Sequence, residues 1–459
     1  AKDFDFSRPF FDQFEDFIAA IPRLGVAVTK SENCDYNMYC VDSKNCYLCQ
    51  RVQAEDCYYC YLPVYSRDCA DCYNINTCEL CYEVIDGQNC YEVAFAQNVV
   101  HCRNSKFLFD CRSCQDCFFC AGVRNAQYYF CNEKYTKEDY EKKIAEFKVL
   151  SRKRKEELWT DFLRLKSTLN VPVFWGNMTE NSSGNYLFEC KNVHESFDIK
   201  DGEDIKYAWG HIYGKDSMDT CFNYHNNNCY ELCSSIHSSH LKCSYACYNE
   251  CLNLEYCMLC MNNSQDLLGC FGMKKAKYCI LNKPYSESDY KALRLKIIDH
   301  MKETREWGAF FPAALSDFAY NETVAQEYFP LDKVGAEKLG YRWRDSEDKS
   351  PDSLGVRTLD VPDNISDVSD SILKQTLYCE KTGKPFKIQK GELKFYKKMG
   401  LPLPVLHHDE RYRARVALRN PRKLWDRQCG ECKKDIRTSY VPGRTERVLC
   451  EGCYLKSLD

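Results

Sequence analysis

Between Cys34 and Cys120 cysteines recur at short and nearly regular intervals, commonly behind an Asn, Asp or Glu and often as the first of a Cys-x-x-Cys pair. Each of these phrases is too short to bury a core alone. In stacked coils, equivalent side chains of neighbouring coils would lie roughly 4.8 Å apart and form a ladder. The pattern therefore predicts a mainly β fold, a cysteine-rich β-solenoid, of the kind that usually serves as a scaffold or binding surface.

Helical patterns flank this segment. Residues 7–18 place aromatic side chains at helical intervals behind a Ser and a Pro, which predicts a short helix that caps the first coil. Start signals and charge predict further helices over 136–169 and 286–305. The aromatic and Pro-containing residues 307–343 are expected to be extended chain packed over the solenoid.

The cysteine-rich pattern occurs twice. Residues 115–140 align without gaps on 265–290, with 10 identities in 26 positions. We therefore expect a tandem duplication, in which each half is a solenoid with capping helices, closed by an Asn-x-x-Tyr motif that leads into a helix.

The same alignment bears on the role of the cysteines. Cys117 is aligned with Leu267, and Cys131 with Leu281. Because metal ligands do not exchange with leucine, most of these cysteines are best interpreted as small, buried packing residues. Two alternatives stay open: a ladder of disulfides between coils, which requires an oxidising compartment, and metal or iron–sulfur sites built from stacked Cys-x-x-Cys pairs.

These patterns divide the chain into seven segments. From residue 345 onward the chain is first a linker rich in Asp and Ser and then a basic module. The segments are an N-terminal helical cap (1–33), a first solenoid (34–135), a helix (136–170), a second solenoid (171–285), a helix with an extended aromatic segment (286–344), an acidic linker (345–375) and a basic zinc-ribbon module (376–459).

Charge is distributed unevenly over the 459 residues. The net charge is −4, but Lys and Arg exceed Asp and Glu by 20 to 10 over 379–459, against 43 to 57 over 1–378. A basic tail on an acidic body favours binding of nucleic acid or an acidic partner. No stretch approaches the roughly 20 apolar residues of a membrane span, and the first residues have no signal-peptide character, so a cytoplasmic protein is expected.

The strongest chemical signal is a pair of Cys-x-x-Cys motifs near the end of the sequence: Cys429 with Cys432, and Cys450 with Cys453. Two such knuckles can place four thiolates tetrahedrally around Zn²⁺, a closed arrangement without a position for substrate. The sequence therefore predicts a structural zinc site.

Two further sets of candidate residues precede these motifs. Cys379, His407 and His408 could form a second metal site. Basic side chains alternate with Tyr412, Leu418 and Trp425, which suits phosphate contacts and base stacking and suits an amphipathic partner-facing segment nearly as well. The candidate nucleic-acid-binding residues are Arg411, Arg413, Arg415, Arg419, Arg422, Lys423 and Arg427.

Several specific phrases are spread over the chain from end to end. They occupy 4–11, 44–49, 282–286, 320–323, 392–396, 401–404 and 419–425, together with the last cysteine pairs. Through them the chain resembles a group of uncharacterised cysteine-rich zinc-ribbon proteins of small-genome uncultivated bacteria. The group tends to have a Cys-x-x-Cys where His407 and His408 stand, so this chain departs from it at the second candidate site. The resemblance implies the architecture and, because the group has no established activity, no function.

No motif for catalysis stands out. The chain has no nucleotide-binding Gly loop, no nucleophile elbow and no His-Glu-x-x-His, so no enzyme is predicted. The densest group of potential ligands elsewhere is His225, Cys229, Cys233, His237 and His240. We expect a non-catalytic zinc-binding scaffold whose basic module binds RNA, a ribosome or another large assembly. The alternatives are a thiol-rich metal or redox protein and a structural protein that self-associates through its solenoid ends.

Overall fold

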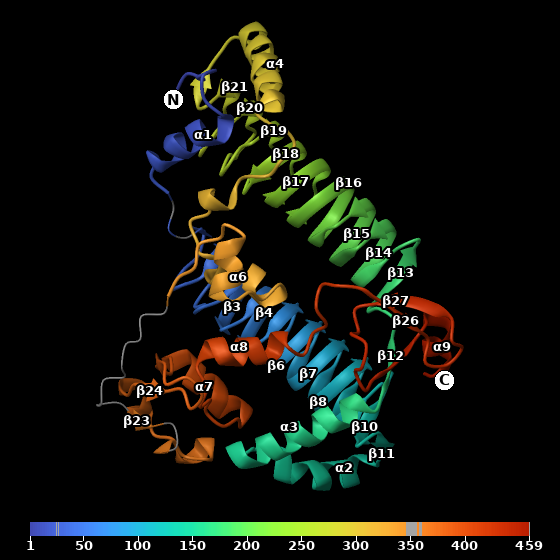
Figure 1. Ribbon diagram of the computed structural model, residues 1–459. Coiled ribbons are helices and arrows are strands. Elements are labelled where there is room, and N and C mark those ends of the chain that lie inside the picture. Colours follow the sequence, from blue (N-terminus) through green and yellow to red (C-terminus); the bar gives the residue numbers. More distant parts are fainter. Residues whose placement is uncertain (24, 26, 346–355, 358–359, 459) are drawn as a thin grey trace.

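The computed structural model describes residues 1–23, 25, 27–345, 356–357 and 360–458. The fold is mainly β, as predicted, and contains two long sheets built almost entirely from parallel strands. The first sheet comprises β1–β11 and the second β13–β22 (Figure 1). Within the described residues, no helix combines the length and the apolar character that crossing a bilayer requires.

In each sheet the strands follow one another in chain order. The first sheet consists of β1 (Val28–Thr29), β2 (Met38–Val41), β3 (Gln50–Tyr58), β4 (Tyr61–Ala70), β5 (Tyr73–Asn76), β6 (Glu79–Gln88), β7 (Tyr91–Val100), β8 (Arg103–Arg112), β9 (Gln115–Ala121), β10 (Gln127–Phe130) and β11 (Glu133–Lys134). The second consists of β13 (Gly176–Glu180), β14 (Gly184–His194), β15 (Ser196–Lys206), β16 (Trp209–Tyr224), β17 (Asn227–Ile236), β18 (Ser239–Tyr245), β19 (Leu252–Glu255), β20 (Gln265–Leu268), β21 (Lys277–Ile280) and β22 (Lys283–Pro284).

The strands return on themselves without a crossover segment. Tyr91 pairs with Arg103, and Arg103 pairs in turn with Gln115, so the offset between paired positions of β7, β8 and β9 is twelve residues. Parallel neighbours normally require a connection of a dozen or more residues, yet only two residues join β6 to β7 and β7 to β8. The strands themselves therefore make the return, by bending at every third residue of 89–107, where φ is positive.

These bends explain why Asn or Asp so often precedes a cysteine. Asn45, Asp56 and Asp68 all have φ near +50°, a left-handed conformation that Asn and Asp tolerate better than other side chains. Their side chains also hydrogen bond between successive repeats: Asn45 Nδ2 donates to Asp56 Oδ1 at 3.0 Å. The residue after each bend points inward.

The interior of the first sheet's repeats is a column of small side chains three residues apart. Eight of these side chains are at most 3% exposed: Cys78, Cys81, Val84, Cys90, Val93, Ala96, Val99 and Cys102. A Cys-x-x-Cys pair in this segment therefore marks two neighbouring inward positions of one repeat, and the larger Ile75 and Leu108 occupy other positions of the same column.

The interior thiols also satisfy backbone carbonyl groups. The Cys102 Sγ lies 3.5 Å from the Val100 oxygen and 3.4 Å from the Cys111 oxygen, two residues earlier and nine later. Ser66 occupies an equivalent position, where its hydroxyl donates to the Val64 oxygen and accepts from the Cys78 amide. None of the 33 cysteines forms a disulfide bond in the structure. The geometry supports the packing interpretation of the interior cysteines.

The second sheet has a polar layer in the middle of its interior. His211, Thr220 and Asn223 are at most 2% exposed, and the His211 Nδ1 lies 3.3 Å from the Thr220 hydroxyl. A Cβ on Gly214 would overlap the His211 ring, so glycine is required there to admit the imidazole. The His211 Nε2 has no hydrogen-bond partner in the structure, which makes this layer a weak point of the second sheet.

The two sheets fold back against each other in opposite directions (Figure 1). At one end of the seam Tyr39 contacts Tyr248, and at the other Tyr186 donates to Asn98 at 3.0 Å. The molecule is therefore not one continuous rod.

The N-terminal helix α1 (Phe10–Ala19) does not cap the first sheet, contrary to the expectation from its sequence position. Phe10 and Phe14 instead pack with Tyr256 and Leu281 at the far end of the second sheet. The backbone amide of Phe10 donates to the Glu306 carboxylate at 2.8 Å. The last repeats of the second sheet provide the apolar surface that the helix covers. The local sequence of the helix does not show which sheet it will cover.

The other helices also refine the predictions. The helical region predicted over 136–169 contains α2 (Lys137–Ile144), a short 3₁₀ turn and α3 (Arg152–Ser167), which the preceding Ser151 caps. Helix α4 (Glu287–Glu303) coincides with the third predicted helix. The segment predicted to be extended contains two 3₁₀ turns, at 313–315 and 320–322, and the short helices α5 (Ala325–Tyr328) and α6 (Lys333–Lys338).

Much of the predicted acidic linker 345–375 lies outside the described residues, namely 346–355 and 358–359. From 360 onward it is packed rather than free, because Ile365, Val368 and Ile372 are buried against the first sheet. The chain then forms β24 (Leu377–Tyr378), which pairs with β23 (Val356–Arg357) and β25 (Pro385–Phe386), followed by α7 (Lys390–Met399) and α8 (His408–Val416). Its last elements are β26 (Trp425–Gln428), β27 (Asp435–Thr438), β28 (Arg447–Leu449) and α9 (Glu451–Lys456).

Candidate metal centre and its surroundings

The four C-terminal cysteines meet in one cluster. Cys429 and Cys432 lie in the turn between the antiparallel strands β26 and β27, while Cys450 precedes α9 and Cys453 lies in its first turn. The ligand atoms of all four lie within 4.8 Å of one another, and the Cys432 and Cys450 sulfurs are 3.7 Å apart. The cluster could hold a metal ion.

Backbone amides favour the thiolate form of one cysteine in this cluster. Burial raises the pKa of Cys429, but hydrogen bonds from the backbone amides of Cys450, Glu431 and Cys432 lower it to about 6. The Cys450 amide lies 3.3 Å from the Cys429 sulfur. A thiolate at this position is therefore available near neutral pH, as a metal ligand must be.

The cluster lies at the junction between the two sheets. Strand β28, which ends immediately before Cys450, pairs in parallel with β12 (Asn170–Pro172), the strand that connects the first sheet's helices to the second sheet. Beyond the cluster, Tyr454 hydrogen bonds to Asp110 of the first sheet, and Arg437 pairs with Glu195 of the second. A metal ion there would fix a turn and a helix that both sheets contact.

The second candidate set is only partly brought together. The ligand atoms of His407 and His408 lie within 4.8 Å of each other and of Asp409, a carboxylate that the sequence analysis did not single out. Cys379 is not part of this group; it is buried in the turn between β24 and β25. A helix start directly after two histidines is the signal that could have pointed to Asp409.

Four of the seven basic residues in the predicted nucleic-acid-binding set are taken up inside the molecule. Arg411 and Arg415 both pair with Asp71, whose side chain is 0% exposed. Arg411, Arg415 and Arg419 are at most 9% exposed. Since their guanidinium groups are buried against carboxylates of this chain, they are not available to phosphate, and this part of the prediction is corrected.

Arg419 connects the two sheets. Its Nε donates to Asp86 Oδ2 of the first sheet at 2.9 Å, and its terminal amino groups pair with Asp198 of the second. Arg422, the fourth of these residues, adds a second contact to Asp198 at 3.3 Å, with its guanidinium 3.7 Å from the centre of the Trp209 ring. Residues 408–422, which we call the strut, thus form a buried link across the seam, the contact surface between the two sheets.

The remaining three residues of the predicted set lie nearer the surface. Arg413 and Lys423 are exposed, and Arg427 is half-buried with a backbone contact to Tyr440 at 3.4 Å. These side chains retain a charge that a partner could reach.

The histidine-rich group in the second sheet does not converge. Cys229 points into the interior, whereas His225 and His237 lie on the surface with stacked rings whose centroids are 4.8 Å apart. Among the described residues, the two ligand groups found near Cys429 and His407 are the only ones of three or more potential ligands.

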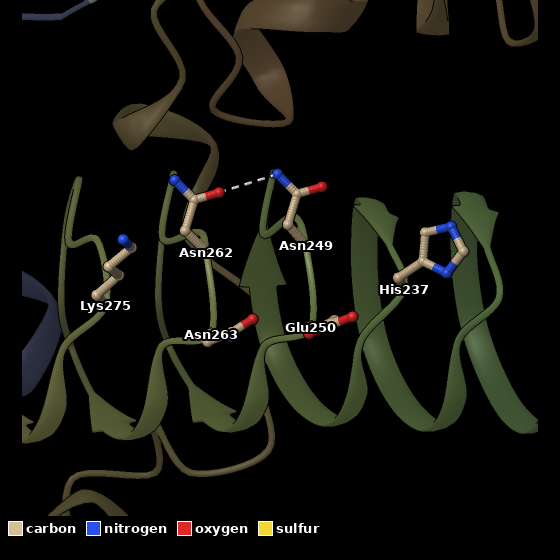
Figure 2. A pocket seen from close by; sticks show the side chains of 6 residues that line it. All are labelled: His237, Asn249, Glu250, Asn262, Asn263 and Lys275. Atoms are coloured by element: carbon tan, nitrogen blue, oxygen red, sulfur yellow. Dashed lines mark hydrogen bonds between the residues drawn. The ribbon is translucent and has the colours of Figure 1, made fainter.

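A polar groove runs along the surface of the second sheet beside His237 (Figure 2). Its volume is about 470 Å³. Asn249 and Asn262 occupy equivalent bends of successive repeats and hydrogen bond at 3.0 Å. The groove is lined by His237, Asn249, Glu250, Asn262, Asn263 and Lys275, five of which are exposed and thus solvated.

Comparisons with known proteins do not identify a family. No protein-family model and no curated protein matches the chain. One solved structure, described as a "putative acetyltransferase" from Desulfovibrio desulfuricans G20, is 8% identical, with a match covering 55% of this chain and 71% of that chain and a TM-score of 0.12. A TM-score this low carries no argument about fold or activity.

Proposed function

We propose that the protein is a non-catalytic scaffold made of two β-solenoids that its C-terminal segment holds in a fixed relative position. The twelve-residue offset between paired positions of β7, β8 and β9 and the bend at every third residue support a coil with four sides of three residues. The observation that carries the scaffold proposal is the strut, because Arg419 pairs with Asp86 of one sheet and Asp198 of the other.

The Cys429–Cys432–Cys450–Cys453 cluster is proposed to bind structural Zn²⁺. Four thiolates complete a tetrahedral shell and leave no open position for substrate. The ion would tie the β26–β27 turn to the start of α9, and so keep β28 in register with β12 between the two sheets.

Elemental analysis paired with small-angle scattering tests this proposal. Cys432→Ser combined with Cys453→Ser should lose one zinc per chain and enlarge the radius of gyration, because the junction between the sheets loosens. Cys131→Ser, a change of an exposed cysteine outside the cluster, is the matched control and should alter neither quantity. Retention of the full zinc content and of the compact shape by the double variant would argue against a structural zinc site.

The partner we propose is RNA, alone or within a ribosome or another large assembly. The charge excess of the C-terminal segment and the exposure of Arg413 and Lys423 support it. Replacing both by Ala should weaken binding of a mixed-sequence RNA and reduce the slope of log affinity against log salt by about one per lost phosphate contact. Salt-insensitive binding, or an unchanged slope, would exclude this surface.

Self-association is a second candidate, supported by the first repeats of the first sheet. Tyr36 and Met38 are 75% and 48% exposed, and β1 pairs only with β2 among the described strands. An uncovered edge with apolar side chains can pair with another copy. Sedimentation over a wide concentration range tests this, since Met38→Lys should lower the mass of any oligomer, and a strictly monomeric wild-type protein would eliminate the idea.

A further inference from the structure

The C-terminal segment contains the same structural unit twice. In the Cys429 turn, the Cys429 amide donates to the Lys434 oxygen at 2.9 Å, and the Lys433 amide returns to the Cys429 oxygen at 3.2 Å. In the Cys379 turn, the Cys379 amide donates to the Lys384 oxygen at 2.9 Å, and the Gly383 amide returns to the Cys379 oxygen at 2.8 Å. The two turns therefore share one hydrogen-bond pattern at the same residue spacing.

The surroundings of the two turns correspond as well. Gly383 and Lys433 have φ values of 67° and 62°. Each turn joins an antiparallel pair of strands, with Tyr378 opposite Pro385 in one and Gln428 opposite Asp435 in the other. Further along the chain each unit includes a helix: α8, which follows the intervening α7, in one, and α9, which follows β28, in the other.

Cys379 and Cys429, the buried cysteines of the two turns, have the same hydrogen-bonding environment. The Cys379 sulfur accepts hydrogen bonds from the backbone amides of His407, Thr382 and Lys381. The Cys429 sulfur accepts hydrogen bonds from the amides at the equivalent positions, Cys450, Cys432 and Glu431.

This correspondence assigns His407 the position of a metal ligand. His407 is the N-cap of α8, as Cys450 is the N-cap of α9. The place of Cys453, three residues further on, is taken by Glu410, which pairs with Lys381 at 2.8 Å. In the Cys379 unit, His407 therefore keeps the position of a ligand, and the other two potential ligands, His408 and Asp409, lie between it and Glu410.

We propose that His407, His408 and Asp409 hold a second divalent metal ion of the Zn²⁺ class at the start of α8. The His407 Nδ1 lies 3.3 Å from Asp409 Oδ2, and the His408 Nδ1 lies 3.1 Å from Asp409 Oδ1. Two imidazoles and one carboxylate suit zinc, cobalt or nickel. The three side chains are 12%, 27% and 36% exposed, so an ion can enter from solvent, and water can complete its shell.

Existing contacts set the affinity of this site. The His407 Nδ1 accepts the Asp409 backbone amide at 3.2 Å, a hydrogen bond that an ion bound to this atom replaces. The Lys384 Nζ lies 3.2 Å from Asp409 Oδ2, so an entering cation displaces an ammonium group. The His408 ring stacks on Tyr59 of the first sheet, with centroids 5.4 Å apart, so the ligand is already oriented. The second ion therefore binds more weakly than an ion in the four-cysteine cluster, and removal of the Lys384 charge strengthens it.

Titration of the metal-free full chain with Co²⁺ tests the proposal. The four-cysteine cluster gives thiolate-to-metal absorption, whereas the second site has no thiolate and gives only the weak bands of nitrogen and oxygen ligands. We expect two equivalents in the wild type. Cys432→Ser with Cys453→Ser should remove the thiolate absorption and keep one equivalent, so failure of either site is seen independently of the other.

Substitutions at the site complete the test. His408→Phe keeps the ring stacked on Tyr59 but offers no ligand, and Asp409→Asn removes the carboxylate; each should weaken the second equivalent at least tenfold and leave the thiolate absorption intact. Lys384→Met should tighten it several-fold. His237→Phe, at a stacked surface histidine, is the matched control. A single equivalent in the wild type, or two in both ligand variants, would overturn the proposal.

Discussion

Arg419→Ala is the change from which we expect the largest loss of stability. The guanidinium is buried between two carboxylates, one from each sheet. Removing one partner of a buried ion pair costs about 3–5 kcal/mol, because it leaves uncompensated charge in a poorly solvated place. Compared with typical total stabilities of roughly 5–15 kcal/mol, this is a large share.

The loss should depend on pH in a defined direction. In the wild type, burial already raises the pKa of Asp86, and Arg419 counteracts that effect; burial also raises that of Asp198, but Arg419 and Arg422 lower it overall. Without Arg419 the pKa of both carboxyl groups should rise, and that of Asp86, which burial already raises, should lie further above its unfolded value. A raised carboxyl pKa destabilises the folded state at high pH and is relieved by protonation, so the loss should be smaller at pH 5 than at pH 7.5.

Urea unfolding at the two pH values measures this prediction. Arg413→Ala is the matched control, because its side chain is 61% exposed and forms a pair within one helix turn. It should change the free energy of unfolding by less than about 1 kcal/mol at either pH. If Arg419→Ala and Arg413→Ala had equal effects, or if the Arg419 loss were independent of pH, the strut would not be a buried ion pair.

Three further outcomes are expected. Burial lowers the pKa of His211 from 6.5 to about 4. The free energy of unfolding should therefore be highest above pH 6.5 and fall by about 3 kcal/mol as the pH drops to 4 and below. His211→Leu should flatten this part of the pH profile of urea unfolding, and an unchanged profile would contradict this role of His211. Cys81→Leu should lose about 1–3 kcal/mol through overpacking, whereas Cys81→Ser should be tolerated because Ser66 occupies an equivalent position, and thermal melting that ranked them in the opposite order would contradict the packing interpretation. Chelation of the bound metal should release thiols at the four-cysteine cluster before the interior thiols react, and simultaneous release would contradict it.

Much of the fold could be predicted from local sequence patterns. The return of cysteines behind Asn or Asp is the direct trace of a bend followed by an inward position, so the parallel β architecture could be predicted. The three-residue spacing of inward positions was also present in every Cys-x-x-Cys pair. A metal-binding motif has the same spacing, and only the burial of the side chains distinguishes the two. Cys429 and Cys432 share the spacing of Cys78 and Cys81, and only the former pair has an exposed member, Cys432.

Long-range contacts could not be predicted from local patterns. The spacing of Arg411, Arg415 and Arg419 suits a helix face in contact with any acidic surface, and phosphate was one such surface. Nothing near these arginines in the chain reveals that Asp71 and Asp86, in the middle of the first sheet, provide the carboxylates. The same holds for the contact of α1 with the last repeats of the second sheet.

The position of the strut in the chain has a consequence for biosynthesis. Residues 408–422 are made after both sheets, so a ribosome has completed Asp71, Asp86 and Asp198 long before it supplies the arginines that neutralise them. Until then, burial of these unpaired carboxylates would cost their hydration, so we expect the two sheets to stay apart. Closure of the molecule is therefore a late step that reports completion of the C-terminal segment, and nascent chains should remain open to chaperones until that segment emerges.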